Sequence, residues 1–311
     1  MVGGAGFIGS HFTDRLLADP KTEAVTLFDN FSSGHEWHYA HHQSDTRLAV
    51  VRADAGDGEA LIDVIAGHDT VIHLAANPDI ARAALEPSID FKEGTVLTHN
   101  VVEAMRITGC PRILYASGSG VYGDRGESEV SEDHGPMLPI STYGASKLAC
   151  EALISSYCHM FGLTACVFRF GNVVGPRQTH GVGYDFIAKL RRDPTRLDIL
   201  GDGRQSKPYI HVDDVVSAVL FANEHAPSKL NIFNAASADA LTVREIADMV
   251  VDCLGLEPGG VNYVFSGGER GWSGDVPVLR LNCDRLRGLG WTCENNSAQA
   301  MRRSLEAQIG Q

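Results

Sequence analysis

The sequence lacks long apolar runs, paired cysteines and basic clusters. No stretch approaches the roughly 20 apolar residues that span a bilayer, so we expect no contact with a membrane. The seven cysteines contain no Cys-x-x-Cys pair and their number is odd, which favours reduced thiols in a cytoplasmic protein over a disulfide framework. The net charge of −13 over 311 residues makes binding of nucleic acid or anionic membranes improbable.

The chain also has no recognised metal-binding spacing. Four of its histidines lie close together, at His35, His38, His41 and His42, without a His-Glu-x-x-His pattern. This arrangement favours a solvated loop or helix, so we predict no metal. We expect no signal peptide either, because a glycine-rich loop begins at residue 3.

The first half of the chain alternates apolar segments with helical patterns, which is typical of an α/β fold with a parallel sheet. The predicted strands are residues 24–28, 49–52, 70–74, 112–116 and 164–169, and the predicted helices are 8–18, 59–65, 96–108 and 143–161. After about residue 171, glycine-rich turns become frequent. We therefore predict a domain at residues 1–170 and a smaller substrate-binding lobe at 171–311, with some segments, such as 231–235, returning to the sheet.

The glycine-rich loop has the spacing of a dinucleotide-binding turn. Gly4, Gly6 and Gly9 form a Gly-x-Gly-x-x-Gly pattern, in which glycine lets the backbone approach a pyrophosphate and the next helix points its N-terminus at it. A predicted strand then ends at Asp29, twenty residues after Gly9. A carboxylate there accepts hydrogen bonds from the adenosine ribose and disfavours a 2′-phosphate. The first half is thus predicted to be a Rossmann-type doubly wound domain that binds NAD.

Only Met1 and Val2 precede this loop, whereas strands usually have about 5–6 residues. The first strand of the sheet is therefore predicted to be truncated, either because the sequence starts too late or because this is a shortened variant of the fold. We expect this to expose the neighbouring strands and to lower stability.

Tyr143 and Lys147 are candidates for a catalytic pair. Residues four apart share a helix face, and an ammonium beside a phenol favours the phenolate. The pair therefore provides a base for chemistry near neutral pH.

Together these motifs resemble the extended short-chain dehydrogenase/reductase family, and within it the UDP-galactose (UDP-glucose) 4-epimerases. The resemblance covers nearly the whole chain. The matching segments are residues 3–10, 29–34, 71–77, 121–123, 143–147, 169–177, 200–212 and 270–275.

The resemblance implies roles for individual residues. The catalytic residues would be Tyr143 and Lys147, with a hydroxyl from Ser117 or Ser119. Asn172, Leu200, Lys207 and Arg270 would bind the sugar nucleotide. The cofactor would be held by Gly3, Gly6, Phe7, Ile8, Gly9, Asp29, Asn30, Ser32, Ser33, Gly34, Asp54, Ala55, Leu74, Ala75, Ala76, Tyr143, Lys147 and Phe170.

Two positions depart from the family pattern. Gly118 stands where the family has the serine or threonine that contacts the sugar O4, and Gly94 stands where it has an asparagine near the cofactor. The same loop also disfavours sister reactions. Dehydratases of the family have an acidic pair there and sugar-acid decarboxylases a glutamate, whereas this chain has Ser119 and Gly120.

These features predict an NAD-dependent 4-epimerase of a UDP-galactose or UDP-glucose type substrate. The alternatives are another NAD-dependent sugar-nucleotide oxidoreductase or epimerase, acting on a UDP-N-acetylhexosamine or a UDP-uronic acid, and a binder of NAD or sugar nucleotide without catalysis. The resemblance also implies a homodimer through the helices at 96–108 and 143–161. Leu148, Ala152 and Ile154 are candidates for the seam, although core packing within one chain explains them equally well.

Overall fold

The computed structural model describes residues 1–310 and contains two compact units. Unit 1 consists of Met1–Val121, Thr142–Arg169 and Val219–Phe233, and unit 2 of the segments between and after them. The units are thus interleaved along the chain, whereas the sequence suggested a main boundary near residue 170.

Unit 1 is built on parallel strands. β1 pairs in parallel with β2, β3 pairs in parallel with β4, and a four-stranded sheet has the order β11-β6-β4-β3. The predicted returning segment at 231–235 lies within β11. The strands are β1 (Val25–Asp29), β2 (Leu48–Arg52), β3 (Thr70–His73), β4 (Arg112–Gly118), β6 (Thr164–Phe170) and β11 (Leu230–Ala235).

Val2 occupies the place between β1 and β3 where the first strand was expected. Val2 forms parallel bridges to both Phe28 of β1 and His73 of β3. Its N–H donates to Ile72 O at 2.9 Å, and its carbonyl accepts from Leu74 N at 2.8 Å. Phe28 and His73 are both buried. The expected exposure of the neighbouring strands was therefore wrong, because the backbone of residues 1–3 pairs with both of them.

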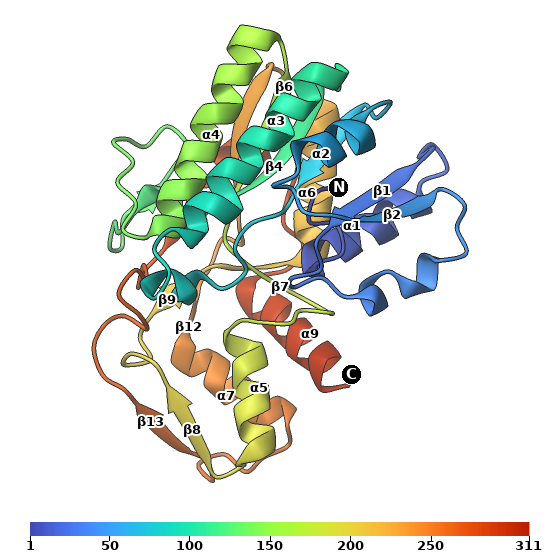
Figure 1. The fold of residues 1–311 in the computed structure, drawn as a ribbon. Helices are drawn as coiled ribbons and strands as arrows, with labels where there is room; N and C mark the ends of the chain where they lie inside the picture. Colours follow the sequence, from blue (N-terminus) through green and yellow to red (C-terminus); the bar gives the residue numbers. More distant parts are fainter. Residues whose placement is uncertain (311) are drawn as a thin grey trace. The chain divides into compact units, whose positions relative to one another are not determined.

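Helices pack on the strands of unit 1, and α3 lies beside α4 (Figure 1). Asp57 caps α2 by accepting from Glu59 N and Ala60 N, and Gly109 ends α3 in the left-handed conformation. The helices with residues in unit 1 are α1 (Phe7–Ala18), α2 (Gly58–Ile65), α3 (Leu97–Thr108), α4 (Thr142–Phe161) and α6 (Val212–His225). Shorter helical turns are η1 (Glu36–His38), η2 (Ala40–His42), η3 (Ile80–Ala84), η4 (Phe91–Val96) and η5 (Ser119–Tyr122).

The core of unit 1 fills the space between these helices and the sheet. Val101 and Met105 of α3, Ile113 of β4 and Val167 of β6 are fully buried in one cluster. Ile154 of α4 belongs to the same cluster and is 1% exposed. Ile154 is therefore a core residue, which selects core packing over the dimer seam, the two explanations that the sequence left open for it.

Unit 2 combines short strand pairs with helices α5, α7 and α9, whose apolar faces share one core. Capping boxes start α7 at Thr242 and α9 at Asn296. The helices are α5 (Val182–Arg192), α7 (Val243–Cys253), α8 (Asp284–Gly288) and α9 (Ser297–Ile309). The strands are β5 (Glu129–Val130), β7 (Asn172–Val174), β8 (Arg196–Ile199), β9 (Ser206–Lys207), β10 (Tyr209–His211), β12 (Leu241–Thr242), β13 (Asn262–Phe265) and β14 (Arg280–Leu281).

The predicted α/β class with a parallel sheet is confirmed. All seven cysteines are free thiols, and burial raises the pKa of Cys166 and of Cys283 to about 11, which keeps these two thiols protonated. None of the helices in residues 1–310 is long and apolar enough to cross a membrane.

Candidate active site

The glycine loop packs so tightly that side chains would collide with backbone. Gly3 has φ +78°, and a Cβ there would lie 2.6 Å from Ala75 N; one on Gly9 would lie 2.4 Å from Gly4 O. α1 begins directly after the loop, and its N-cap, Gly6, makes no side-chain hydrogen bond. The N–H groups of the first turn therefore face the loop without a capping side chain, an arrangement that suits a pyrophosphate.

Asp29, the last residue of β1, links this loop to the strand. Its Oδ2 accepts from Ala5 N at 2.9 Å, and its Oδ1 accepts from Phe31 N at 2.8 Å. Each carboxylate oxygen keeps a second lone pair, which leaves acceptor capacity for a ribose diol. Gly34 is needed alongside, because a Cβ there would lie 3.0 Å from Asp29 Oδ1.

The other residues predicted for the adenosine end form a small polar network after β1 and β2. Asn30 Nδ2 donates to Asp54 Oδ2 at 2.9 Å, and Asn30 Oδ1 accepts from Ser32 N. Asp54 Oδ1 accepts from Gly56 N at 2.7 Å. Since carboxyl ends of parallel strands share one sheet edge, Asp29, Asp54 and Leu74, which follow or end β1, β2 and β3, lie along the same edge.

Tyr143 and Lys147 lie in the first turns of α4. Lys147 is 4% exposed, and its Nζ donates to Ala116 O of β4 at 2.7 Å. The ammonium lies 5.5 Å from the centre of the Tyr143 ring and 5.0 Å from that of Tyr115. Among the described residues no carboxylate pairs with this cation, so N–H donors of a nearly buried ammonium remain for a ligand and for the Tyr143 oxygen.

Ser117, one of the two hydroxyls considered from the sequence, is engaged elsewhere. It is buried, and its Oγ donates to Glu151 Oε1 at 2.6 Å. Glu151 also accepts from Arg169 Nη2 at 2.7 Å, and these two side chains are 5% and 1% exposed. Ser117 thus belongs to a buried ionic network that joins β4, α4 and β6. Sequence reasoning missed this network because its members are 18 and 34 residues apart.

Gly118 lies close to Tyr143, the predicted base. A Cβ on Gly118 would be 3.8 Å from Tyr143 Cε1, an ordinary contact, so a side chain at this position faces the tyrosine. Ser119 starts η5 and is partly exposed. Within residues 1–310 its hydroxyl has no hydrogen-bond partner, which leaves Ser119 available to a substrate.

Gly94 has a packing explanation. It lies in η4, a π-helical turn, and a Cβ there would come within 2.3 Å of Ser146 Oγ. Ser146 Oγ fills this space and donates to Asp90 O at 2.7 Å. An asparagine does not fit beside Ser146 without displacing it, so the departure from the family pattern reflects a local repacking.

Asp90 was not found from the sequence, although it fixes the start of α4. Its Oδ2 accepts from Thr142 Oγ1 at 2.6 Å, and its Oδ1 accepts from Asn77 Nδ2 at 2.8 Å. Asp90 is 1% exposed. It therefore holds the residue before Tyr143, and no local pattern in the sequence distinguishes it from the nearby acidic residues Glu86 and Glu93.

The residues predicted to bind substrate, and Phe170, lie in unit 2. Lys207 Nζ forms an ion pair with Asp275 Oδ1, and Arg270 pairs with Asp124 Oδ2 and donates to the Asp275 carbonyl. Asn172 begins β7, and Leu200 is 61% exposed. Both predicted cations are thus balanced by carboxylates, which an anionic ligand has to replace.

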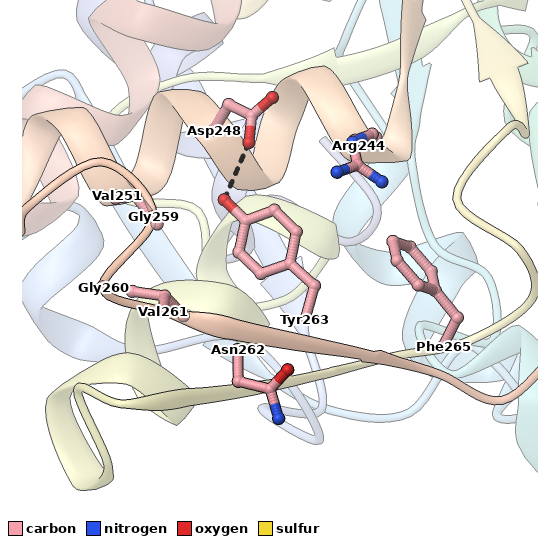
Figure 2. A pocket seen from close by; sticks show the side chains of 9 residues that line it. All are labelled: Arg244, Asp248, Val251, Gly259, Gly260, Val261, Asn262, Tyr263 and Phe265. Carbon is pink, nitrogen blue, oxygen red and sulfur yellow. Dashed lines mark hydrogen bonds between the residues drawn. The ribbon is translucent and has the colours of Figure 1, made fainter.

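Figure 2 shows a separate pocket of unit 2, of about 460 Å³, between α7 and β13. Tyr263 donates its hydroxyl hydrogen to Asp248 Oδ1 at 2.8 Å, and Arg244 lies 5.8 Å from the Tyr263 ring centre. None of the residues predicted for catalysis, cofactor or substrate lines this pocket. Of its polar side chains, Tyr263 and Asp248 are hydrogen-bonded to each other.

Comparison with known proteins identifies the family. Residues 1–236 match the sequence model of the NAD dependent epimerase/dehydratase family. The chain is 30% identical to a putative UDP-glucose 4-epimerase of Methanocaldococcus jannaschii, over 97% of this chain and 95% of that protein. It is similar to a crystal structure of a UDP-galactose 4-epimerase, with 36% identity, a TM-score of 0.87 and coverage of 99% and 97% of the two chains.

A dehydratase of the same family is as similar in fold. The structure of a dTDP-glucose 4,6-dehydratase from Streptomyces venezuelae, solved with NAD bound, has a TM-score of 0.90 at 26% identity, with coverage of 99% of this chain and 96% of that one. The Rossmann-like fold, the glycine loop and the Asp29 carboxylate all fit this cofactor. The chain belongs to the NAD-dependent epimerase/dehydratase family of enzymes that act on sugar nucleotides, and its cofactor is NAD.

Proposed function

We propose that this protein is an NAD-dependent 4-epimerase of a UDP-sugar of the UDP-galactose or UDP-glucose type. The observation that carries the proposal is the Tyr143–Lys147 pair. The nearly buried Lys147 ammonium lies beside the Tyr143 ring, and it has N–H groups without an acceptor among the described residues. A tyrosine so placed serves as the base for oxidation of a sugar hydroxyl.

In the proposed reaction Tyr143, as phenolate, removes the proton from the sugar 4-hydroxyl and later returns it. NAD, when bound, would supply the hydride chemistry at C4. Lys147 stabilises the phenolate charge and holds the ribose next to the nicotinamide. Ser119 supplies the hydroxyl that supports the sugar O4, because Ser117 is committed to Glu151.

The loop chemistry favours epimerisation over the other reactions of the family. Residues 117–123 read Ser-Gly-Ser-Gly-Val-Tyr-Gly and contain no carboxylate. A 4,6-dehydration needs acid and base groups beyond the tyrosine to move protons at C5 and C6. With none in this loop, Tyr143 serves one proton transfer at O4, as epimerisation requires.

We assign the nucleotide diphosphate to Lys207 and Arg270, with Asn172 as a hydrogen-bond donor and Leu200 near the base. Asp275 and Asp124 neutralise the two cations when no anion is bound. A diphosphate competes with these carboxylates, and charge-assisted bonds to a phosphate are among the stronger hydrogen bonds in proteins.

Product analysis after incubation with UDP-glucose and with UDP-galactose tests this function. The wild-type protein should interconvert them without added NADH, and Tyr143→Phe should lower kcat by roughly 10²–10⁴-fold. Tyr184→Phe is the matched control, because Tyr184 is a half-exposed tyrosine of α5 in unit 2. Full activity of Tyr143→Phe would contradict the mechanism.

The same assay with UDP-N-acetylglucosamine and UDP-glucuronic acid measures substrate breadth. Turnover of these sugars alone would move the specificity to the N-acetylhexosamine or uronic acid class. Net consumption of NADH with a keto-sugar would instead identify a reductase, and NAD binding without any turnover would identify a binder.

We also propose a homodimer through α3 and α4. The apolar side chains Ile107, Met160 and Phe161 of these helices are 51%, 71% and 47% exposed, which is unfavourable for a surface that stays in water. Light scattering should give twice the chain mass, and Met160→Lys should lower it toward that of a single chain.

A further inference from the structure

The histidine-rich segment 35–42 contacts the Asp14 carboxylate in the folded chain. The Nε2 atoms of His41 and His42 lie 2.7 and 2.8 Å from the same oxygen, Asp14 Oδ1. We call these three residues the Asp14 cluster. His41 is 49% exposed, Asp14 37% and His42 23%, so the cluster lies at the surface of unit 1 with one side open to solvent. It lies outside every set of residues assigned above to cofactor or substrate.

The two elements that carry the cluster are fixed by contacts of their own. Asp14 lies in α1. The segment that ends in His41 and His42 is held by the buried Tyr39, and by His35 N and His38 Nδ1, which lie 3.1 and 2.7 Å from Ala5 O. The packing of the backbone therefore brings the side chains of Asp14, His41 and His42 together. A ligand of the cluster would not have to order a flexible loop.

The geometry of the two histidines is unusual for neighbours in sequence. Adjacent side chains generally diverge, yet the His41 and His42 ring centres are 4.2 Å apart and both Nε2 atoms point to one oxygen. The other carboxylate nearby, Asp45, is occupied, because Arg47 Nη2 donates to its Oδ2 at 2.7 Å. Asp14 is thus the carboxylate that serves both imidazoles.

We propose that the Asp14 cluster binds a divalent transition-metal ion, with zinc as the preferred ion. Two imidazole nitrogens and one carboxylate oxygen form a ligand set that suits zinc, and an open side leaves the fourth position to water. Calcium and magnesium prefer all-oxygen sites, so they fit poorly. In the bound form both histidines coordinate through Nε2 and carry their proton on Nδ1.

Only small movements are needed for an ion to enter. Bonds of about 2.0–2.1 Å in a tetrahedral site place ligand atoms roughly 3.3 Å apart, compared with the 2.7 and 2.8 Å distances to Asp14 Oδ1. The partly exposed side chains can open by about 0.5 Å through small torsions. The ion then replaces the two contacts to the carboxylate.

A metal here would join parts of the chain 27 residues apart. It would tie α1, which follows the glycine loop, to the segment that follows Asp29. Both of these segments are next to residues that we expect to hold NAD. The ion therefore has a structural role, in which it joins the two segments, and it takes no part in proton transfer. Binding to the folded state alone lowers the unfolding equilibrium constant about 100-fold at a free zinc concentration of 100 times Kd.

Isothermal titration of untagged, chelator-treated protein with zinc chloride tests the proposal. We expect one zinc per chain, with an affinity at least about tenfold weaker in His41→Ala and in His42→Ala. His159→Ala is the matched control, because His159 is an exposed histidine of α4, and it should bind as the wild type does. Cobalt(II) in place of zinc should give the visible absorption of a low-coordinate site in the wild type and lose it in Asp14→Asn.

Thermal unfolding with and without zinc supplies a second readout. Zinc should raise Tm of the wild type and of His159→Ala, and leave His42→Ala unchanged. The proposal is overturned if the wild type shows no saturable binding, or if His41→Ala and His42→Ala both bind zinc as tightly as the control. In either case the cluster is a hydrogen-bonded ion pair only.

Discussion

Alanine at Ser117 and alanine at Ser119 should have opposite effects, although both residues lie in the same loop. Ser117 is buried and donates to the Glu151 carboxylate at 2.6 Å. Ser119 is partly exposed, and its hydroxyl has no partner among residues 1–310. The first substitution therefore removes a structural contact, and the second removes the hydroxyl that we assign to the sugar O4.

The magnitudes follow from these environments. A hydrogen bond to a charged group contributes about 1.5–3 kcal/mol, so Ser117→Ala should lower the free energy of unfolding by that amount while kcat changes little. Ser119→Ala removes no hydrogen bond within residues 1–310, so the free energy of unfolding should change by less than about 0.5 kcal/mol. Its kcat should fall roughly 10²–10⁴-fold, if the hydroxyl takes part in proton transfer.

Urea unfolding and initial epimerisation rates, measured on the same preparations, separate the two effects. A rescue variant sharpens the test: Gly118→Ser in the Ser119→Ala background should restore activity, because a Cβ at 118 lies 3.8 Å from Tyr143 Cε1 without a clash. A Ser119→Ala enzyme with the wild-type rate, together with a Ser117→Ala enzyme that is stable and inactive, would refute the assignment.

Three further predictions concern stability. Glu151→Ala should cost about 3–5 kcal/mol in urea unfolding, because it removes a buried carboxylate that pairs with the buried Arg169 guanidinium; a loss below 1 kcal/mol would show that this pair contributes little. Burial, with the nearby Lys147 charge as a second cause, lowers the pKa of His73 from 6.5 to about 3. The folded state thus binds fewer protons than the unfolded state, so stability is complete above pH 6.5 and falls toward pH 3, by roughly 2 kcal/mol at pH 5. His73→Gln should remove this part of the acid sensitivity, and an unchanged pH profile would contradict it. Gly3→Ala should destabilise by about 2 kcal/mol or more, since φ is +78° and the added Cβ meets backbone at 2.6 Å, whereas Gly58→Ala in open space should not destabilise; equal effects of the two would argue against the close approach.

Local patterns in the sequence were sufficient to predict the main strands and helices of unit 1. The predicted strand at 112–116 and helix at 143–161 correspond to β4 (Arg112–Gly118) and α4 (Thr142–Phe161), because period and turn residues act over a few positions. The glycine spacing and Asp29 were likewise sufficient to indicate a dinucleotide, since both belong to one strand–helix–strand unit.

Contacts between distant segments could not be predicted in this way. The sequence left Ser117 and Ser119 equivalent, and only the fold placed Ser117 against Glu151, 34 residues away. It indicated a truncated strand, whereas the backbone of residues 1–3 hydrogen-bonds to both β1 and β3.

The Asp14 cluster shows the same limit. Composition and spacing determined the class of the protein, its cofactor and the Tyr143–Lys147 pair, since each depends on residues close in sequence. The tertiary structure alone decided which hydroxyl remains available to a sugar and which carboxylate faces His41 and His42. Contacts between residues far apart in sequence depend on how the helices pack on the sheet, and this packing is determined by the whole hydrophobic core.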